Sequence, residues 1–507
     1  MVYFKKVKEG IEMKDKVKFK KIHIAVIIVG IIFILLSAFH SNIWFDEAYS
    51  VGMAERTFTE IWNIGGHDVH PVLYYWMLRI LSLALSAWGL TSIAGKIMLY
   101  RIFSIVPIAI LGILGYTHIK KDFGEKTGII FSFLTFFLPE CVIYANEIRM
   151  YSWSILAVTV LAIYAYRLRL PENSTRKNWL IFFFASISSI FLHYYGLMAA
   201  GLINVVLLIY LIIHKRGKDI IAICTFGFIQ LIAYIPWLMY LASQLTNVSK
   251  GYWIKFTFPN TIFELLAGQI IGNQNYNVGF VIAICLYVYL GIIFYKYKEN
   301  KTPAKLSIGI YLAVVVAAVV MTKILHTDII YYRYLFVITG LYIFTISFIL
   351  SKEKNNKIIW VVCAIIATMG TATNIKMIKD GYSKNNFKQY EYLKENIQKD
   401  DSIVFKEIDN GSTISIFFPE NEKYFYNPEN WNVEEAYKAF GNQMKTYINT
   451  DFIKELDGRI WIIDTLDKSL YNELFNNEEY KVLNEKEFIT KYHNYSLNIM
   501  LIEKIKE

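Results

Sequence analysis

Long apolar runs separated by short polar loops recur along the chain between residues 22 and 375. An apolar run of about 20 residues is long enough to cross a bilayer as a helix. The pattern therefore predicts a polytopic α-helical membrane protein with about eleven transmembrane helices, at 22–40, 102–118, 127–144, 153–168, 179–194, 196–213, 219–242, 278–294, 306–325, 335–350 and 358–375.

One further apolar run, at 72–89, is interpreted as a helix in the membrane interface. Arg79 lies in its middle and aromatic residues lie near both ends, as is typical of interfacial helices. With this run on the surface, the N-terminal segment and five loops on the same side hold 25 Lys and Arg residues, against 8 in the opposite loops. Because basic loops stay in the cytoplasm, we expect a multi-pass protein of the cell membrane with a cytoplasmic N-terminus.

The last part of the chain changes pattern. A helical stretch at Phe387–Gln398 is followed by strand-like runs, which together predict a small α/β domain; the runs are Ser402–Phe405, Ile414–Phe418, Arg459–Asp464 and Leu497–Ile502. The expected organisation is a cytoplasmic basic segment, a transmembrane domain with outer-face interfacial helices at 46–90, and a soluble extracytoplasmic α/β domain, at 1–21, 22–377 and 378–507 respectively.

Charge is distributed unevenly along the chain. The whole sequence carries a formal net charge of +10, yet from residue 379 onwards it has 17 basic and 24 acidic residues. The basic excess thus lies in the membrane part, where the charge rule for loops accounts for it, and binding to nucleic acid is not expected. The four cysteines lie in or beside apolar runs without a CxxC pair, so no disulfide framework or zinc site is predicted.

The first candidate for chemistry is the acid pair Asp46-Glu47, shortly after the first apolar run. Adjacent helical side chains point about 100° apart, so one carboxylate can face a reactant as a general base while the other binds a neighbour or a metal. The alternative is that both acids only stabilise the start of an interfacial helix at Ala48–Ile61.

The segment His67-Asp68-Val69-His70-Pro71 follows. His67 and His70 are candidate ligands of a divalent metal, although such a turn is more often structural. His70 is also a candidate for orienting a phosphate or a carboxylate.

Basic and aromatic residues gather in two other outer loops. In Asn146–Tyr151, Arg149 either pairs with Glu147 or holds a phosphate while Glu147 positions the reactants. Near the start of a late span, Arg333 beside Tyr334 either snorkels to lipid headgroups or grips the phosphate of a lipid-linked substrate, and Lys255 has the same two interpretations. The turn at His193–Gly196 is interpreted as packing.

These motifs, taken in order, resemble those of the GT-C glycosyltransferases, in the branch of the protein O-mannosyltransferases and the aminoarabinose lipid A transferases. The resemblance covers roughly residues 20–350 and rests on Phe45-Asp46-Glu47-Ala48-Tyr49, His70-Pro71-Val72-Leu73-Tyr74-Tyr75-Trp76, Glu147-Ile148-Arg149-Met150-Tyr151 and Arg333-Tyr334. Val72 stands where the family usually has a second proline.

The resemblance implies an enzyme of the hexosyl- or pentosyltransferase class that takes a sugar from a polyprenyl phosphate and transfers it to an acceptor on the outer face. The transfer is expected to invert the configuration at the anomeric carbon. The resemblance also implies Asp46 as the base, with Glu47 and Glu147 as supporting acids. Arg149, Arg333 and Lys255 become phosphate ligands, and His70, Tyr151 and Tyr334 complete the substrate site. The expected partners are the lipid-linked donor, an unknown acceptor and the bilayer; no cofactor is certain, and a divalent metal stays open.

Three alternatives remain at this point. The first is a membrane glycan polymerase or ligase, the second a transporter of lipid-linked sugars, and the third a non-catalytic membrane protein. The sequence lacks a Walker-type nucleotide loop and has few charges within its spans, which disfavours an ATP-driven or ion-coupled transporter.

Overall fold

The computed structural model describes residues 2–250, 254–272, 276–298, 300–441 and 444–505. The chain divides into two compact units. The helical unit comprises Met1–Leu36, Ile102–Met239 and Val248–Ile375, and the sheet unit comprises Ser37–Arg101, Tyr240–Asn247 and Lys376–Glu507. The sheet unit thus combines the segment Ser37–Arg101 with the C-terminal part of the chain, across the boundary at 377/378 that the sequence pattern placed between two domains.

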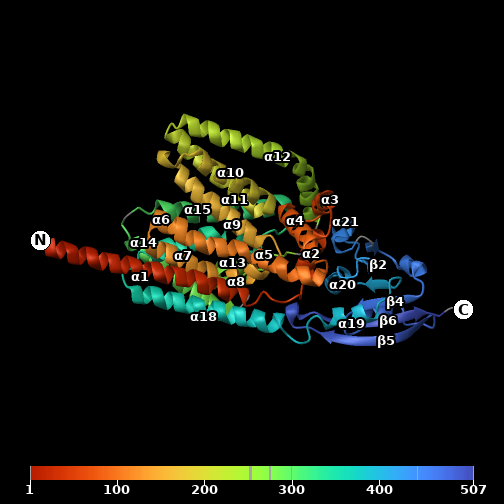
Figure 1. Ribbon diagram of the computed structural model, residues 1–507. Coiled ribbons are helices and arrows are strands. Elements are labelled where there is room, and N and C mark those ends of the chain that lie inside the picture. Colours follow the sequence, from red (N-terminus) through yellow and green to blue (C-terminus); the bar gives the residue numbers. More distant parts are fainter. Residues whose placement is uncertain (1, 251–253, 273–275, 299, 442–443, 506–507) are drawn as a thin grey trace. The chain divides into compact units, whose positions relative to one another are not determined.

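The helical unit is built from long apolar helices, with α1 packed along α7 (Figure 1). Its helices are α1 (Val2–Leu35), α5 (Ile93–Leu114), α6 (Lys120–Phe123), α7 (Glu125–Phe137), α8 (Pro139–Asn146), α9 (Tyr151–Leu168), α10 (Arg176–Leu192), α11 (Tyr194–Ile213), α12 (Gly217–Lys250), α13 (Asn260–Ile271), α14 (Tyr276–Lys296), α15 (Thr302–Leu325), α16 (Tyr332–Leu335), α17 (Thr339–Leu350) and α18 (Asn356–Gly381). The helices α5, α12 and α18 each run from one unit into the other.

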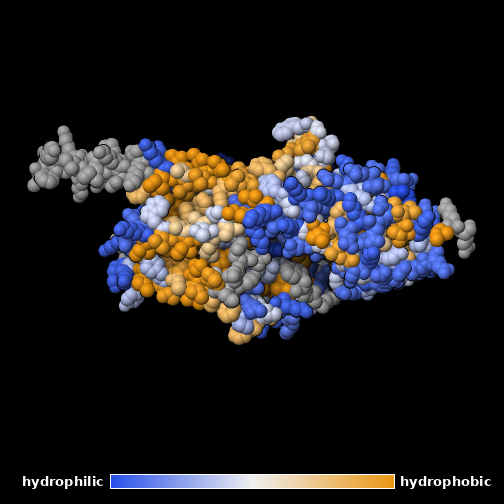
Figure 2. Space-filling view, turned by 90° about the horizontal axis from the view of Figure 1, so that it is seen from below, coloured by the Kyte–Doolittle hydropathy of each residue, from blue (hydrophilic) through white to orange (hydrophobic). Residues whose placement is uncertain are grey.

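The membrane-spanning character of these helices is clear from their surfaces. Within the described residues, eight helices are long and apolar enough to cross a membrane, and the bent pair α7 and α8 makes a ninth if it is one span. Large apolar side chains such as Phe228 and Leu231 face outwards, and Figure 2 shows hydrophobic side chains over much of the helical unit. The protein is therefore a multi-pass membrane protein, while the predicted count of eleven spans is not confirmed.

Three of the eleven predicted spans differ in detail from the others. The run at 127–144 forms two helices bent by 58°, because Leu138 is extended and Pro139 starts a new helix. The run at 179–194 forms α10, whose 17 residues are near the shortest length that crosses a bilayer. The run at 22–40 belongs to α1, which ends at Leu35.

The first segment of the sheet unit forms three short helices: α2 (Phe45–Ala54), α3 (Phe58–Gly66) and α4 (Leu73–Ala87). The prediction of one helix over Ala48–Ile61 is wrong, because Thr57 caps a new helix there: its side chain accepts the Glu60 backbone N–H while Glu60 accepts from the Thr57 backbone. With 15 residues, α4 is about 22 Å long, shorter than the hydrocarbon core of a bilayer.

The C-terminal part forms a six-stranded sheet in the order β3-β2-β1-β4-β6-β5. The first four of these strands are parallel to one another. Strand β6 pairs antiparallel with β4, and β5 pairs antiparallel with β6. The elements are α19 (Lys388–Asn396), β1 (Ser402–Phe405), α20 (Ile408–Ser415), β2 (Lys423–Tyr426), α21 (Glu434–Tyr437), β3 (Met444–Tyr447), β4 (Arg459–Asp464), α22 (Ser469–Leu474), β5 (Tyr480–Ile489) and β6 (Ser496–Lys504). A core that includes Val404, Ile462 and Met500 holds them together.

The strand predictions at 402–405, 459–464 and 497–502 agree with β1, β4 and β6. The prediction at Ile414–Phe418 is wrong, because residues up to Ser415 belong to α20 and the rest form the turn after it. A short apolar run does not distinguish a buried strand from a buried helix end. The strands β2, β3 and β5 were not predicted.

Candidate functional site

The acid pair opens helix α2 in the sheet unit. Trp44 is extended and precedes the helix, so that Asp46 and Glu47 lie in its first turn, where the helix dipole stabilises negative charge. Their surroundings differ sharply. The Glu47 side chain is fully buried, whereas Asp46 is only half-buried. Asp46 is therefore the acid that a reactant can reach.

Glu47 is held by a buried ion pair. Its carboxylate oxygens lie 2.5 and 3.2 Å from the two terminal nitrogens of Arg101, and the Tyr492 hydroxyl donates to it at 2.9 Å. Arg101 also donates to the backbone carbonyl of Asn42 at 2.7 Å. A charge in this position is costly unless paired, so Glu47 serves to fix the first turn of α2 and with it the backbone of Asp46.

The C-terminal part of the sheet unit encloses the start of α2. Trp44 stacks on His493 with ring centroids 4.5 Å apart, and the backbone N–H of Phe45 donates to the Tyr495 hydroxyl at 2.9 Å. At the other end of α2, Arg56 donates to the Lys438 carbonyl at 2.6 Å. These contacts join residues about 380 to 450 positions apart in sequence, which no local pattern could have predicted.

A second carboxylate, Asp409, lies near Asp46. It occupies the first turn of α20, which packs against α2. Although its side chain keeps an exposed surface, partial burial and the charges of Asp46 and Glu407 raise the pKa of Asp409 above its ordinary value. The sequence analysis missed this residue. The signal was its position just after the strand 402–405, because ligands in such folds bind beyond the carboxyl ends of parallel strands.

The histidines of the segment 67–71 have separate environments. The His67 ring is exposed and its Nδ1 lies 2.9 Å from the Asn63 carbonyl, whereas His70 is buried with 4% exposure. Between them, Asp68 accepts a long hydrogen bond of 3.4 Å from Tyr75. In the part of the chain that the structure describes, no three His, Cys, Asp or Glu side chains form a group that could hold a metal ion.

The other candidates belong to the helical unit, where three of them lie around His193 and a fourth, Arg333, lies beside one of the three. Arg149 is buried just before α9 and interacts electrostatically with His193. The rings of Tyr151 and Tyr334 lie 5.8 and 5.2 Å from that of His193. The Arg333 guanidinium lies 5.9 Å from the Tyr151 ring. We call Arg149, Tyr151, His193, Arg333 and Tyr334 the cationic cluster.

Two other predicted residues lie at the margin of this cluster. Glu147 is buried directly after α8, two residues before Arg149. Lys255 lies in an exposed loop, where the backbone N–H of the next residue, Phe256, donates to Asp328 at 2.7 Å. The structure thus brings the two arginines and the two tyrosines together, and the role of Lys255 as a phosphate ligand stays a prediction. His193, which the sequence analysis interpreted as packing, lies among them.

A buried acid inside the helical unit was also missed. Glu140, at the start of α8, is fully buried. Gln269 donates to it at 3.4 Å and to the Tyr332 carbonyl at 3.2 Å, and Thr339 donates to the other end of the Gln269 amide. This network ties α8 and α13 to the backbone beside Arg333.

Comparisons with known proteins identify the fold. No known family and no curated protein matches the chain by sequence. Among solved structures, ArnT from Cupriavidus metallidurans in the apo state matches with a TM-score of 0.62 and 9% identity over 94% of this chain and 97% of that chain. The chain has the fold of ArnT. The same protein bound to undecaprenyl phosphate matches with a TM-score of 0.57 and 11% identity, with the same coverage.

The ArnT fold confirms the fold class expected from the sequence, a polytopic α-helical membrane protein with a C-terminal α/β domain. It also confirms the resemblance to the aminoarabinose lipid A transferase branch at the level of the fold. The match extends beyond the roughly 330 residues that carried the motifs, because it includes the C-terminal sheet.

Proposed function

We propose that this protein is an integral membrane glycosyltransferase of the GT-C type. It moves a hexose or a pentose from a polyprenyl phosphate to a lipid, protein or glycan acceptor on the outer face of the cell membrane, with inversion at the sugar. The observation that carries the proposal is the ArnT fold over 94% of the chain, for which one solved structure holds undecaprenyl phosphate. The motif order and the reachable carboxylate of Asp46 support it.

In this proposal Asp46 removes the proton from the acceptor hydroxyl. The freed oxygen attacks the anomeric carbon of the sugar, the bond from that carbon to the phosphate oxygen breaks, and the polyprenyl phosphate leaves with the electron pair. General-base catalysis by a positioned carboxylate contributes about 10²–10⁴-fold to such a step. The buried pair of Glu47 and Arg101 supplies the positioning.

The cationic cluster is assigned to the phosphate of the donor. Negative charge builds on the phosphate as the sugar leaves, and fixed guanidinium groups stabilise that charge more in the transition state than in the ground state. Arg149 and Arg333 supply these groups, and arginine suits the role because its planar fork matches phosphate oxygens. Glu147 and His70 keep their predicted supporting roles in this proposal, and a requirement for a metal stays open.

The test is sugar transfer by the purified full-length protein in detergent. It is offered radiolabelled undecaprenyl-phosphate sugars, one at a time, with a cell-envelope extract as acceptor. Wild type and Asp46→Asn are compared, and Asp400→Asn serves as the matched control because Asp400 is an exposed aspartate of the sheet unit. All three must give the same elution profile and thermal unfolding.

Label that moves with wild type and Asp400→Asn, but falls at least about 100-fold with Asp46→Asn, supports both the class and the base. Full transfer by Asp46→Asn would refute the assignment of the base while keeping the enzyme class. Folded wild-type protein that transfers from no donor would contradict the proposed function.

A further inference from the structure

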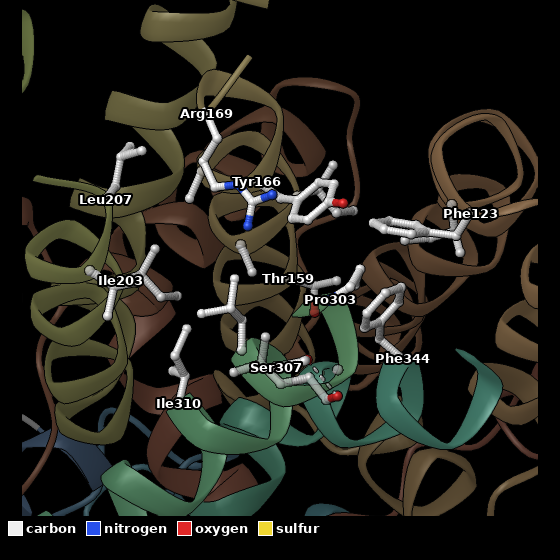
Figure 3. A pocket seen from close by; sticks show the side chains of 18 of the residues that line it. Phe123, Thr159, Tyr166, Arg169, Ile203, Leu207, Pro303, Ser307, Ile310 and Phe344 are labelled. Carbon is white, nitrogen blue, oxygen red and sulfur yellow. Dashed lines mark hydrogen bonds between the residues drawn. The ribbon is translucent and has the colours of Figure 1, made fainter. Parts of the chain in front are cut away.

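The helical unit holds a cavity of about 120 Å³ between four helices. Figure 3 shows it from close by, with aliphatic side chains from α9, α11, α15 and α17 around it. The hydroxyl groups of its threonine and serine already donate hydrogen bonds, Thr159 to the Ile155 carbonyl and Ser307 to the Leu341 carbonyl. The body of the cavity therefore offers an occupant only hydrocarbon contacts. We call it the apolar pocket.

One end of the apolar pocket carries a positive charge. The Arg169 guanidinium lies 4.3 Å from the ring of Tyr166 and 5.2 Å from the ring of Tyr210, and all three residues line the pocket. Its Nε is buried and has no hydrogen-bond partner among the described residues. The neighbouring arginines differ, because Arg167 is paired with Asp122 and Arg216 with Asp219.

The charged end of the pocket is remote from the cationic cluster. Along α9, Arg169 follows Tyr151 by 18 residues, which corresponds to about 27 Å of helix, close to the thickness of the hydrocarbon core. An anion at Arg169 is therefore in the opposite leaflet from a phosphate held beside Tyr151. By the distribution of basic loops, Arg169 is at the cytoplasmic end of the helix.

We propose that the apolar pocket binds one anionic glycerophospholipid of the cytoplasmic leaflet, with part of an acyl chain in the cavity and its phosphate against Arg169. Basic sites between membrane helices on this side are suited to anionic headgroups, and a guanidinium stacked on aromatic rings is already oriented for phosphate. A dry apolar cavity of about 150 Å³ takes up benzene, so this one accepts a short stretch of chain. Val206, which lines the pocket, is 37% exposed, so the chain enters from the lipid side.

The experiment is native mass spectrometry of the full-length protein released from detergent micelles. Phosphatidylglycerol and phosphatidylcholine are added separately, and undecaprenyl phosphate is then added to the protein that carries phosphatidylglycerol. The variants are Arg169→Gln, which removes the charge, and Ala162→Phe, which places a ring in the cavity that Ala162 lines. The control is Arg176→Gln, which removes the same charge from an exposed position at the same end of the neighbouring helix.

We expect wild type and Arg176→Gln to retain one phosphatidylglycerol in preference to phosphatidylcholine. Arg169→Gln should weaken this binding by about tenfold, the scale of one charge-assisted contact, without affecting phosphatidylcholine. Ala162→Phe should weaken both lipids. Elution and thermal unfolding of each variant check that the protein remains folded.

Several outcomes would overturn the proposal. If the wild type binds the two phospholipids equally, Arg169 selects no headgroup. The same conclusion follows if Arg169→Gln prefers phosphatidylglycerol to phosphatidylcholine as strongly as the wild type does. An equal loss in Arg176→Gln would assign the preference to general surface charge. Undecaprenyl phosphate that displaces phosphatidylglycerol in wild type but not in Arg169→Gln would assign the pocket to the sugar-donor lipid. None of these readouts depends on sugar transfer, so the proposed function stands or falls separately.

Discussion

Replacing either member of the buried pair Glu47–Arg101 should destabilise the protein far more than replacing both. The two side chains are 0% and 1% exposed and share two hydrogen bonds. Removal of one partner from such a pair leaves an uncompensated buried charge, at a cost of about 3–5 kcal/mol. Replacement of both by apolar residues of similar volume is often close to neutral. We therefore expect Glu47→Leu and Arg101→Met each to lose that amount, and the double variant to recover most of it.

The assay is unfolding of the full-length protein in an SDS titration, with sugar transfer measured on the same preparations. The double variant should fold but transfer slowly, because Tyr492 and the Asn42 carbonyl lose the groups that fix the start of α2. As the control, Asp451→Ala breaks an exposed pair with Lys454 and should leave unfolding unchanged. The reasoning is refuted if both single variants are as stable as wild type, or if the double variant transfers at the full rate.

Three other predictions concern single charges. Asp409→Asn should raise the free energy of unfolding at pH 7 and make no difference below about pH 4. The reason is that partial burial and the charges of Asp46 and Glu407 raise the pKa of Asp409. Its charged form therefore destabilises the fold once the pH rises above the ordinary pKa of an aspartate. Burial and the charge of Arg56 lower the pKa of Lys423 to about 8. Between pH 8 and about 10 this lysine is protonated only in the unfolded chain, so the stability of the wild type should rise over that range. Lys423→Met should lack this rise. Arg333→Gln should lower kcat/KM for the donor by at least about tenfold, the scale of one lost charge-assisted hydrogen bond.

Each of these predictions has an outcome that contradicts it. Equal pH dependence in Asp409→Asn and wild type would show that this carboxyl titrates normally. A wild-type rise above pH 8 that persists in Lys423→Met would have another source. If Arg333→Gln keeps the wild-type kcat/KM for the donor, measured with initial rates over a range of donor concentrations, Arg333 does not belong to the phosphate site. The matched control is Lys323→Gln, which removes one positive charge at the end of α15.

The sequence predicted the membrane helices well because a lipid environment permits little else. A helix that satisfies its own backbone groups and is apolar all round is readable from one stretch of chain. The break at Pro139 within 127–144 was not predicted, although proline, which cannot donate to the preceding turn, marked the position in the sequence. The separation of α2 from α3 depended on the capping box of Thr57 and Glu60, a local signal that the apolar pattern obscured.

The site was predictable only in part. The motifs supplied Asp46, Arg149 and Arg333 as candidates, because residue type and position at a span end carry information on their own. The partners that define their environments did not follow from any local pattern. Arg101 is 54 residues from Glu47 and Tyr492 is 445 residues from it, and such pairings arise only when the chain has folded.

The composition of the sheet unit has a consequence for biosynthesis. Its first segment, Ser37–Arg101, is made well before the residues that complete its packing, Tyr492 and Tyr495 among them. The helix that carries Asp46 therefore waits, with its apolar faces uncovered, for more than 260 residues of the helical unit to be inserted. Truncation of strand β6 and the turn before it would leave a protein whose spans insert normally and whose helix α2 never reaches its packed state.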